Sequence, residues 1–288
     1  MTHTSGNTQM FALRSGPPKR IELDGAGYEL RRVFKHDFWA ATCLYGFDDD
    51  SPGPTPEILQ IVVKFGRQQP FCGLPIGFYG RWLANHEHAI YKKLEGIEGI
   101  PRCLGLTAKD GLAIEYIDAL PLDHHRDVPS VLFDDLRRLL NEVHDRGVAY
   151  CDANKRSNIL VAPNGRAFLI DYQIALATRD KLPWPLRAIL RHAVRYMAER
   201  DLYHLYKHKR RLLPDELKPE EEALSRKLGG LHLLHRKLTK FYRHLRRRFL
   251  HSQYSKGALR SPTAELEDHP QPEKASWRDN TTPPLADQ

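Results

Sequence analysis

The residues best suited to chemistry lie in one loop of the chain and at the end of a strand that follows it. Asp152, Lys155 and Asn158 fall within a single short loop, and Asp171 ends an apolar segment further along. Transfer of a phosphoryl group from ATP needs these side-chain types. A carboxylate orients the attacking hydroxyl, an amide and a second carboxylate hold Mg²⁺, and a cation neutralises charge on the phosphoryl group. The set therefore predicts a phosphoryl-transfer site that uses ATP and Mg²⁺.

Regular elements on both sides of this loop are predicted to hold it in place. A helix over residues 130–146 has an apolar stripe and ends at Gly147, a residue favoured just after helices. Apolar residues 159–161 and 167–170 are separated by Asn164-Gly165, which predicts a β-hairpin. A buried strand that ends in an acid at the mouth of a loop is typical of metal sites.

A second constellation joins a strand to a helix. Lys64 lies near the end of a strongly β-prone run and shares a strand face with Val62. Glu87 falls on the apolar stripe of a helix predicted over residues 79–94. A carboxylate that points inward needs a partner, and Lys64 is the nearest candidate cation. Glu95 is the competing acid, but it lies off the stripe.

Composition limits the class of protein. The chain has 288 residues, 41% of them hydrophobic, and its four cysteines are far apart without a Cys-x-x-Cys pair, so neither a zinc site nor a disulfide framework is predicted. No apolar run approaches the roughly 20 residues of a membrane span, and residues 1–18 lack a signal-peptide layout. The net charge of +8 attracts acidic partners. The basic runs 207–211 and 236–248 are either solvated helix faces or binding surfaces.

The order of predicted elements indicates an α+β fold with a small β-rich part followed by a mostly helical part. Residues 1–18 and 252–288 are predicted to be disordered tails. The predicted strands and helices are as follows: strands 28–33, 40–47, 58–65, 102–106 and 112–116; helices 79–94, 130–146, 186–200, 219–228 and 231–249.

The loop and hairpin resemble the catalytic and metal-binding loops of protein-kinase-like enzymes, in particular the bacterial lipopolysaccharide-kinase and RIO-type branches. The resemblance implies a two-lobed fold, with an N-lobe over residues 19–117 and a reduced C-lobe over residues 118–251. It departs from the usual kinase signature. Tyr150-Cys151 stands where His-Arg is expected, Asp171-Tyr172-Gln173 replaces Asp-Phe-Gly, and the loop between Asp152 and Asn158 has one extra residue.

The resemblance also implies a role for each catalytic and metal-binding residue. Asp152 orients the hydroxyl, Asn158 and Asp171 bind Mg²⁺, and either Lys155 or its neighbour Arg156 meets the transferring phosphoryl group.

The same resemblance gives the expected nucleotide contacts. Lys64 and Glu87 form the ion pair that positions the ATP phosphates, with Val62 beside them, and Glu115 and Ile117 match the segment whose backbone meets adenine. No glycine-rich loop joins the first two strands.

We therefore expect a cytoplasmic kinase whose acceptor is a hydroxyl on a glycolipid sugar or on a protein Ser or Thr. The basic run 236–248 predicts an amphipathic helix. This helix either packs on the protein or contacts an anionic membrane surface at the inner face, and nucleic acid is a weaker third alternative. Two other functions stay open, a catalytically weak nucleotide-binding scaffold and an RNA- or ribosome-associated ATPase.

Overall fold

The computed structural model describes residues 11–36, 38–50, 53–70, 77–108, 111–125 and 127–226. These residues form two compact units. Of the described residues, the first contains the segments up to Thr55 and Lys64–Arg81, and the second contains Pro56–Val63 and residues 82–226. The predicted helix 231–249 and the predicted tail 252–288 lie outside the described residues.

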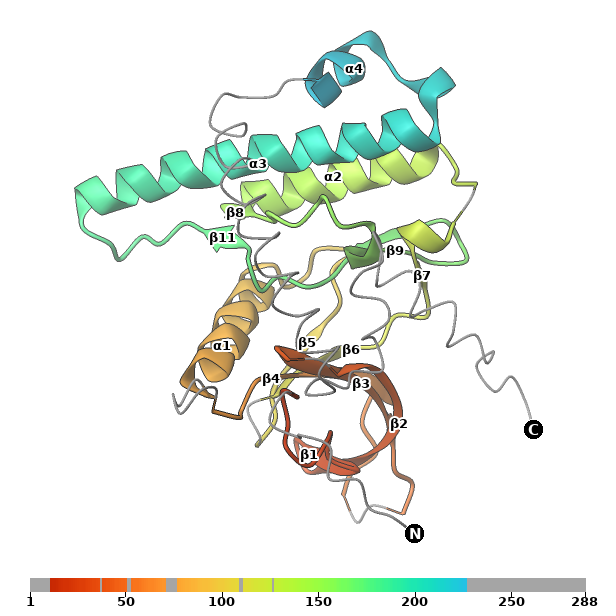
Figure 1. Ribbon diagram of the computed structural model, residues 1–288, viewed down its shortest axis with the longest axis vertical. Helices are drawn as coiled ribbons and strands as arrows, with labels where there is room; N and C mark the ends of the chain where they lie inside the picture. Colours follow the sequence, from red (N-terminus) through yellow and green to blue (C-terminus); the bar gives the residue numbers. More distant parts are fainter. Residues whose placement is uncertain are drawn as a thin grey trace, which may run out of the picture. The chain divides into compact units, whose positions relative to one another are not determined.

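The strands of the first unit begin with a hairpin that the sequence analysis did not predict. Strand β1 (Arg20–Leu23) pairs antiparallel with β2 (Ala26–His36). Asp24 and Gly25, between them, both have positive φ, at 50° and 80°, as a two-residue hairpin turn requires. The Asp-Gly dipeptide was the available signal for this turn. β2 then pairs with β3 (Ala40–Phe47), close to the predicted strands, and Figure 1 shows these strands curling.

Strand β4 (Gln60–Gly66) starts in the second unit and ends in the first. The six-stranded sheet has the order β1-β2-β3-β4-β6-β5, with β5 at Cys103–Leu106 and β6 at Gly111–Glu115. Ile61, Val63 and Phe65 are buried, whereas Val62 and Lys64 are half-buried. The predicted alternation along this strand is therefore confirmed.

The buried side chain of Arg67 joins several segments of the first unit by hydrogen bonds. Arg67 is 1% exposed, lies 3.9 Å over the Phe38 ring, and donates to the carbonyl oxygens of Phe38 at 2.9 Å and Gln69 at 3.0 Å. It also donates to the carbonyl oxygen of Phe11 at 3.3 Å, and the Gln68 amide donates to that of Ala12 at 3.0 Å. Ala12 and Leu13 are buried. The disordered segment predicted through residue 18 therefore does not include residues 11–13, because Arg67, Gln68 and His36 hold them by hydrogen bonds.

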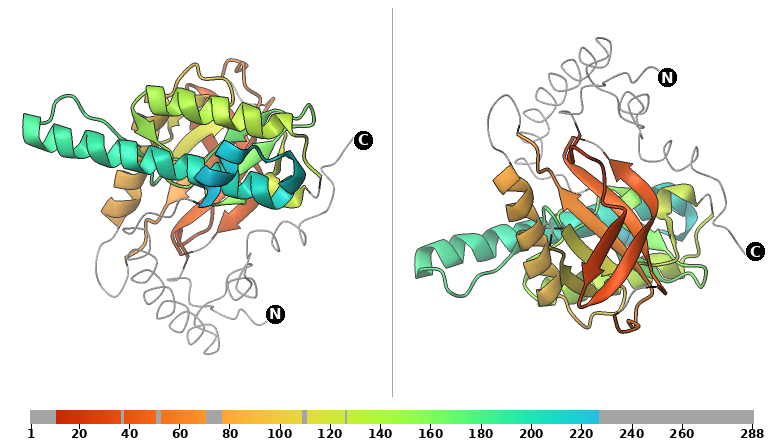
Figure 2. Two further views of the ribbon diagram at one scale, coloured as in Figure 1. Left: turned by 90° about the horizontal axis from the view of Figure 1, so that it is seen from above. Right: turned by 90° about the horizontal axis from the view of Figure 1, so that it is seen from below.

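The second unit is mostly helical beyond β6. Helix α1 (Gly77–Lys93) enters it from the first unit, and α2 (Val131–Asp145) and α3 (Trp184–Leu212) run alongside each other (Figure 1). Figure 2 shows the first turns of α3 extending past the end of α2. The remaining elements are β7 (Leu120–Pro121), η2 (Leu122–His124), β8 (Val148–Ala149), η3 (Arg156–Asn158), β9 (Ile159–Val161), β10 (Ala167–Leu169), β11 (Leu176–Ala177), η4 (Pro214–Glu216) and α4 (Pro219–Arg226).

The core of the second unit confirms the predicted stripe of α2. Its buried side chains include Leu132, Leu136, Leu139, Leu140 and Val143. Helix α3 is longer than the predicted helix 186–200, and its buried residues include polar ones, namely Asp201, His208 and Lys209. None of the described helices combines the length and the apolar character that crossing a bilayer requires.

The predicted order, a β-rich part followed by a mostly helical part, is therefore confirmed. Helix α1 and strands β5 and β6, which were assigned to a lobe ending at residue 117, group with the helical residues. The boundary between the lobes stays a prediction.

Candidate active site

The loop after β8 brings together the first group of predicted residues. Asp152 is 7% exposed, and its Oδ2 accepts a hydrogen bond from Asn158 Nδ2 at 2.8 Å. The same oxygen lies 2.7 Å from Lys155 Nζ, whose side chain is 47% exposed. The loop thus places the ammonium group and the amide in direct contact with the same carboxylate oxygen, and the three residues lie together as their spacing in the sequence predicted.

The hairpin after this loop places Asp171 beside the same group. Strands β9 and β10 pair antiparallel, with Leu169 opposite Ile159. The Ile170 amide donates to the Asn158 carbonyl oxygen at 3.1 Å, so Asn158 is hydrogen-bonded to the residue just before Asp171. Tyr150 Oη also donates to the Ile170 carbonyl oxygen, which fixes the start of the loop to the end of the hairpin.

Asp171 has a φ of 65°, in the left-handed region that Gly adopts freely and that other residues adopt at some cost, Asp less than most. Such strain persists only where the surroundings fix the backbone, and it is common at functional sites.

Asp201 on α3 holds the start of the loop that follows β8. It is 1% exposed, and its carboxylate accepts hydrogen bonds from the Tyr150 amide at 2.8 Å and the Cys151 amide at 2.9 Å. His144 Nε2 lies 3.1 Å from Asp201 Oδ2. Burial raises the pKa of Asp201, while His144 and the two amides lower it. Cys151 has a φ of 67°, and these hydrogen bonds hold it in that conformation.

The sequence analysis missed Asp201, because nothing near it in the sequence distinguishes it from a solvated acid of a helix.

His208, also on α3, holds the other side of the loop. His208 Nε2 lies 2.9 Å from the Ala153 carbonyl oxygen, so this nitrogen carries the proton and donates. Arg156 Nε donates to His208 Nδ1 at 3.3 Å, and Lys207 Nζ donates to Asn154 Oδ1 at 3.0 Å. Burial lowers the pKa of His208 to about 4, and nearby cations contribute in the same direction. The imidazole is therefore neutral at pH 7, which its acceptor role toward Arg156 requires.

Glu87 lies inside the protein, as its place on the apolar stripe predicted. It is 2% exposed, and its Oε1 accepts a hydrogen bond from the Tyr172 amide at 3.0 Å. The Tyr172 ring packs edge-on against Tyr91 and Tyr150, with 5.0 Å between centroids in each pair. Helix α1 is thus connected to the residue after Asp171. Glu95, the competing acid, is exposed.

The predicted partner of Glu87 belongs to the other unit. Lys64 and Val62 lie on the half-buried face of β4, and the Lys64–Glu87 ion pair stays a prediction. Glu115 ends β6, and its Oε2 accepts a hydrogen bond from the Arg102 amide at 3.1 Å. Ile117 follows β6 and is half-buried. A role for Glu115 and Ile117 in adenine binding is likewise untested by these contacts.

The donor atoms at the loop suit a magnesium ion. Asn158 Nδ2 is used by Asp152, which directs the amide oxygen Oδ1 away from Asp152. Oxygen atoms of an amide and a carboxylate are the ligands Mg²⁺ prefers, and it commonly takes one or two carboxylates together with substrate phosphates. Asn158 and Asp171 match that pattern. Within the ranges that the structure describes, no cluster of three or more His, Cys, Asp or Glu side chains is placed to bind a metal ion by itself.

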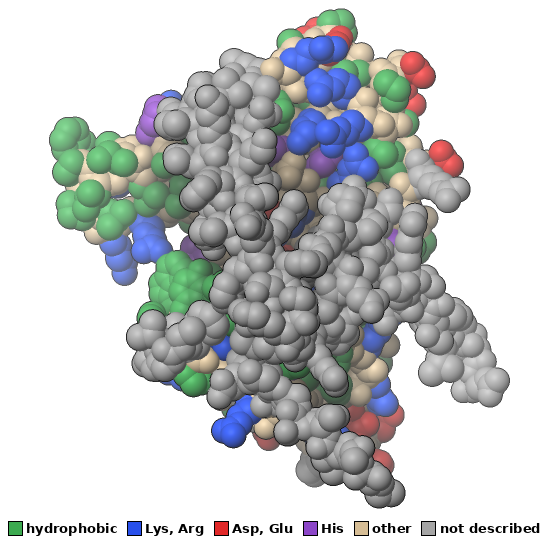
Figure 3. All heavy atoms as spheres, viewed as in Figure 1, with side chains coloured by type: hydrophobic (Ala, Val, Ile, Leu, Met, Phe, Trp, Pro, Cys, Tyr) green, Lys and Arg blue, Asp and Glu red, His purple; other side chains and the backbone are tan. Residues whose placement is uncertain are grey.

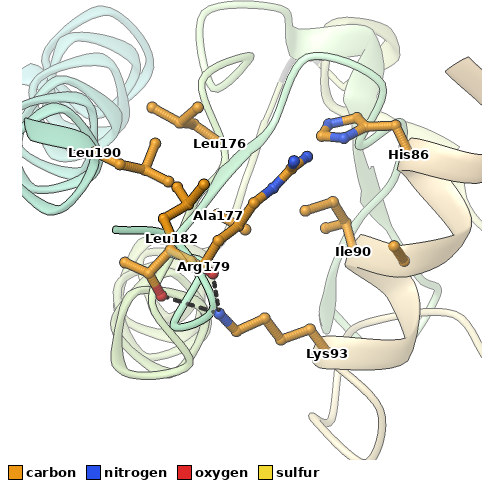
Figure 4. A pocket seen from close by; sticks show the side chains of 10 residues that line it. His86, Ile90, Lys93, Leu176, Ala177, Arg179, Leu182 and Leu190 are labelled. Carbon is orange, nitrogen blue, oxygen red and sulfur yellow. Dashed lines mark hydrogen bonds between the residues drawn. The ribbon is translucent and has the colours of Figure 1, made fainter. Parts of the chain in front are cut away.

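A separate cavity of about 360 Å³ lies between α1, the segment around β11 and the start of α3 (Figure 4). Lys93 Nζ, on α1, donates to Thr178 O at 3.1 Å and to Thr178 Oγ1 at 3.0 Å, and His86 Nε2 lies 2.9 Å from the Ala175 carbonyl oxygen. The predicted catalytic and metal-binding residues do not line this cavity. These contacts connect α1, the helix that carries Glu87, to the segment that follows Asp171.

Comparison with solved structures shows distant similarity in fold. No protein-family model and no curated protein matches the chain. Two crystal structures of the Rio2 kinase from Chaetomium thermophilum are similar to it at 16% identity. One is a complex with ADP, Mg²⁺ and phosphoaspartate, with a TM-score of 0.46 over 73% of this chain and 62% of that one. The other has a TM-score of 0.47 over 73% and 64%. The chain thus spans less than two thirds of either Rio2 chain, and the similarity concerns the overall fold alone.

Proposed function

We propose that this chain is a protein-kinase-like phosphotransferase that transfers the γ-phosphoryl group of ATP to a hydroxyl. The proposal rests on the hydrogen bond between Asp152 and Asn158. Asn158 is in turn hydrogen-bonded to Ile170, the residue before Asp171. A carboxylate, an amide and a second carboxylate at the ends of one loop and one hairpin are the parts that phosphoryl transfer needs.

Each side chain has a defined task in this proposal. Asp152 accepts a hydrogen bond from the acceptor hydroxyl and orients its oxygen toward the γ-phosphorus. As the new P–O bond forms, the bond to the β-phosphate oxygen breaks, ADP leaves, and the hydroxyl proton passes to Asp152 and then to water. Asn158 and Asp171 would hold Mg²⁺, which supplies charge neutralisation on the phosphate oxygens when it is bound.

The cations have supporting tasks. Lys155 contacts Asp152, which supports assigning to it the neutralisation of the transferring group, and Arg156 is the alternative for that role. We also propose that Lys64, held by Glu87, contacts the ATP phosphates, and that the backbone at Glu115 and Ile117 meets adenine. The acceptor is a glycolipid sugar or a protein side chain.

The proposal is tested first by nucleotide binding. Mg-ATP at one hundred times its Kd stabilises a protein by about 2.7 kcal/mol. We expect a corresponding rise in the melting temperature of the wild type, and its loss in Asp171→Ala. Asp180→Ala removes an acid whose side chain is 83% exposed, and it should keep the rise. If Mg-ATP does not stabilise the wild type, the proposal is wrong, and the protein has a kinase-like fold but does not bind the nucleotide.

Phosphoryl transfer is tested separately. Asp152→Asn should keep the stabilisation by Mg-ATP and lose transfer of labelled phosphate to acceptor or water. Stabilisation without transfer in the wild type identifies a nucleotide-binding scaffold. Undiminished transfer by Asp152→Asn means that another group orients the hydroxyl.

A further inference from the structure

A group of cations borders the catalytic loop where α3 passes it. Arg156 comes from η3, and Lys207, Arg210 and Arg211 come from the last turns of α3. We call these residues the basic cluster. Figure 3 shows Lys and Arg side chains gathered over α4 and the end of α3, with a histidine between them. His208 connects the cluster to the loop, because it contacts both Arg156 and the carbonyl oxygen of Ala153, next to Asp152.

Arg156 is held in a defined orientation. Its Nε donates to neutral His208 Nδ1 at 3.3 Å. The two terminal amino groups of this guanidinium have no hydrogen-bond or ion-pair partner among the residues that the structure describes. A guanidinium fixed through Nε presents its remaining N–H groups as a planar fork, which matches the oxygens of a carboxylate or phosphate.

Among the residues that the structure describes, no acid forms an ion pair with a residue of the basic cluster. Arg211 is exposed and has no ion-pair partner in the described part of the chain. Arg210 donates to Ser225 and Lys207 to Asn154, both neutral residues. Burial lowers the pKa of Lys207, and Arg211, Arg210 and Arg156 add to the effect.

Lys209, in the middle of the same basic run, shows the contrasting arrangement. It is 4% exposed and lies 2.8 Å from Glu221 Oε2. Burial and Arg211 lower the pKa of the Arg156 guanidinium, and the opposite effect of the Asp123 carboxylate is smaller. The basic run therefore divides into one buried ion pair and a set of cations that repel one another.

We infer that the basic cluster binds an anionic group of the acceptor, so that the substrate carries a phosphate or carboxylate close to the hydroxyl that is phosphorylated. This inference rests on the proposed function. Arg156 and Arg211 supply the direct contacts, and His208 is a positioning residue that orients Arg156. Repulsion within the cluster is relieved when the anion binds, which favours charged acceptors over neutral ones.

The test must separate the acceptor from the phosphates of ATP. We would saturate the full chain with Mg²⁺ and a non-hydrolysable ATP analogue, and then titrate glucose 6-phosphate, glucuronate and glucose by calorimetry. We expect glucose 6-phosphate, glucuronate or both to bind while glucose does not. The preference between the two anions identifies the phosphate or the carboxylate as the recognised group.

Charge variants assign the binding to the cluster. Arg156→Gln and Arg211→Gln should each weaken binding of the preferred anion about tenfold or more, because each removes a charge-assisted contact. Arg195→Gln removes the same charge from an exposed position on the same helix, and it should leave binding unchanged. Arg211→Gln changes an exposed side chain, so its result does not depend on refolding of the loop.

Several results would overturn the inference. These are equal binding of glucose and the anions, unchanged affinity in both arginine variants, or binding of the anions only when the ATP analogue is left out, which would assign the cluster to the nucleotide. Binding of a short RNA with steep salt dependence, without binding of either anion, would assign it to nucleic acid. If Mg-ATP stabilises the wild type and no anion binds, only this inference fails. If Mg-ATP does not stabilise it, the proposed function fails as well.

Discussion

Asp201→Asn provides the sharpest test of how the catalytic loop is held. The carboxylate accepts hydrogen bonds from the amides of Tyr150 and Cys151 and contacts His144. The asparagine side chain keeps one acceptor oxygen, but an NH₂ group replaces the other. This NH₂ group then faces the N–H of Tyr150 or Cys151, which loses its acceptor. Hydrogen bonds to charged groups contribute about 1.5–3 kcal/mol each, and an unsatisfied buried N–H costs about 1–3 kcal/mol. Removing a buried charge recovers part of the desolvation cost, since burial is what raises the pKa of Asp201.

We therefore expect Asp201→Asn to lower the free energy of unfolding by about 2–3 kcal/mol. For a chain of this size, that loss corresponds to a decrease in Tm of about 4–12 °C. Urea denaturation followed by circular dichroism measures the first quantity, and a thermal scan measures the second. Phosphoryl transfer should fall as well, because Cys151, next to Asp152, is no longer held at positive φ.

Asp180→Asn is the matched control for Asp201→Asn, since it removes an exposed carboxylate and should stay within about 0.5 kcal/mol of the wild type. An Asp201→Asn protein as stable as this control would refute the anchoring role.

Two further predictions concern residues away from the catalytic carboxylates. The pKa of His208 is about 4 in the folded protein, below its ordinary value of 6.5, so the unfolded chain binds the proton more tightly. The contribution of His208 to the free energy of unfolding should be constant well above pH 6.5 and fall as the pH decreases toward 4, by up to about 1.4 kcal/mol per pH unit. In His208→Gln, the urea denaturation midpoint should decrease less between pH 7 and pH 5 than it does in the wild type. An equally steep decrease in this variant would assign the pH dependence to other groups. Arg67→Lys should destabilise the protein by about 2–4 kcal/mol, because an ammonium group cannot reproduce the guanidinium fork. The exposed Arg31→Lys is its control, and similar midpoints for both variants would contradict the role of Arg67.

Local patterns in the sequence were sufficient for most elements of the fold. The apolar stripe of α2, the alternation along β4 and the hairpin between β9 and β10 follow from periods of 3.6 and 2 residues and from turn chemistry. The inward position of Glu87 was predicted in the same way. The predictions failed where the sequence gave no periodic signal, as for the packed residues Ala12 and Leu13, whose hydrogen-bond partners Gln68 and His36 lie far along the chain.

The spacing of Asp152, Lys155 and Asn158 is a property of the sequence alone, since a loop of that length brings its own side chains into contact. The tertiary structure decided which residues hold this loop in place. Asp201 and His208 lie about fifty residues away on a helix whose sequence looks merely charged, and only the packing of that helix against the loop gives them their partners. The division of the basic run into a buried ion pair and an unbalanced cluster has the same cause, because burial and the position of Glu221 are set by packing rather than by sequence spacing.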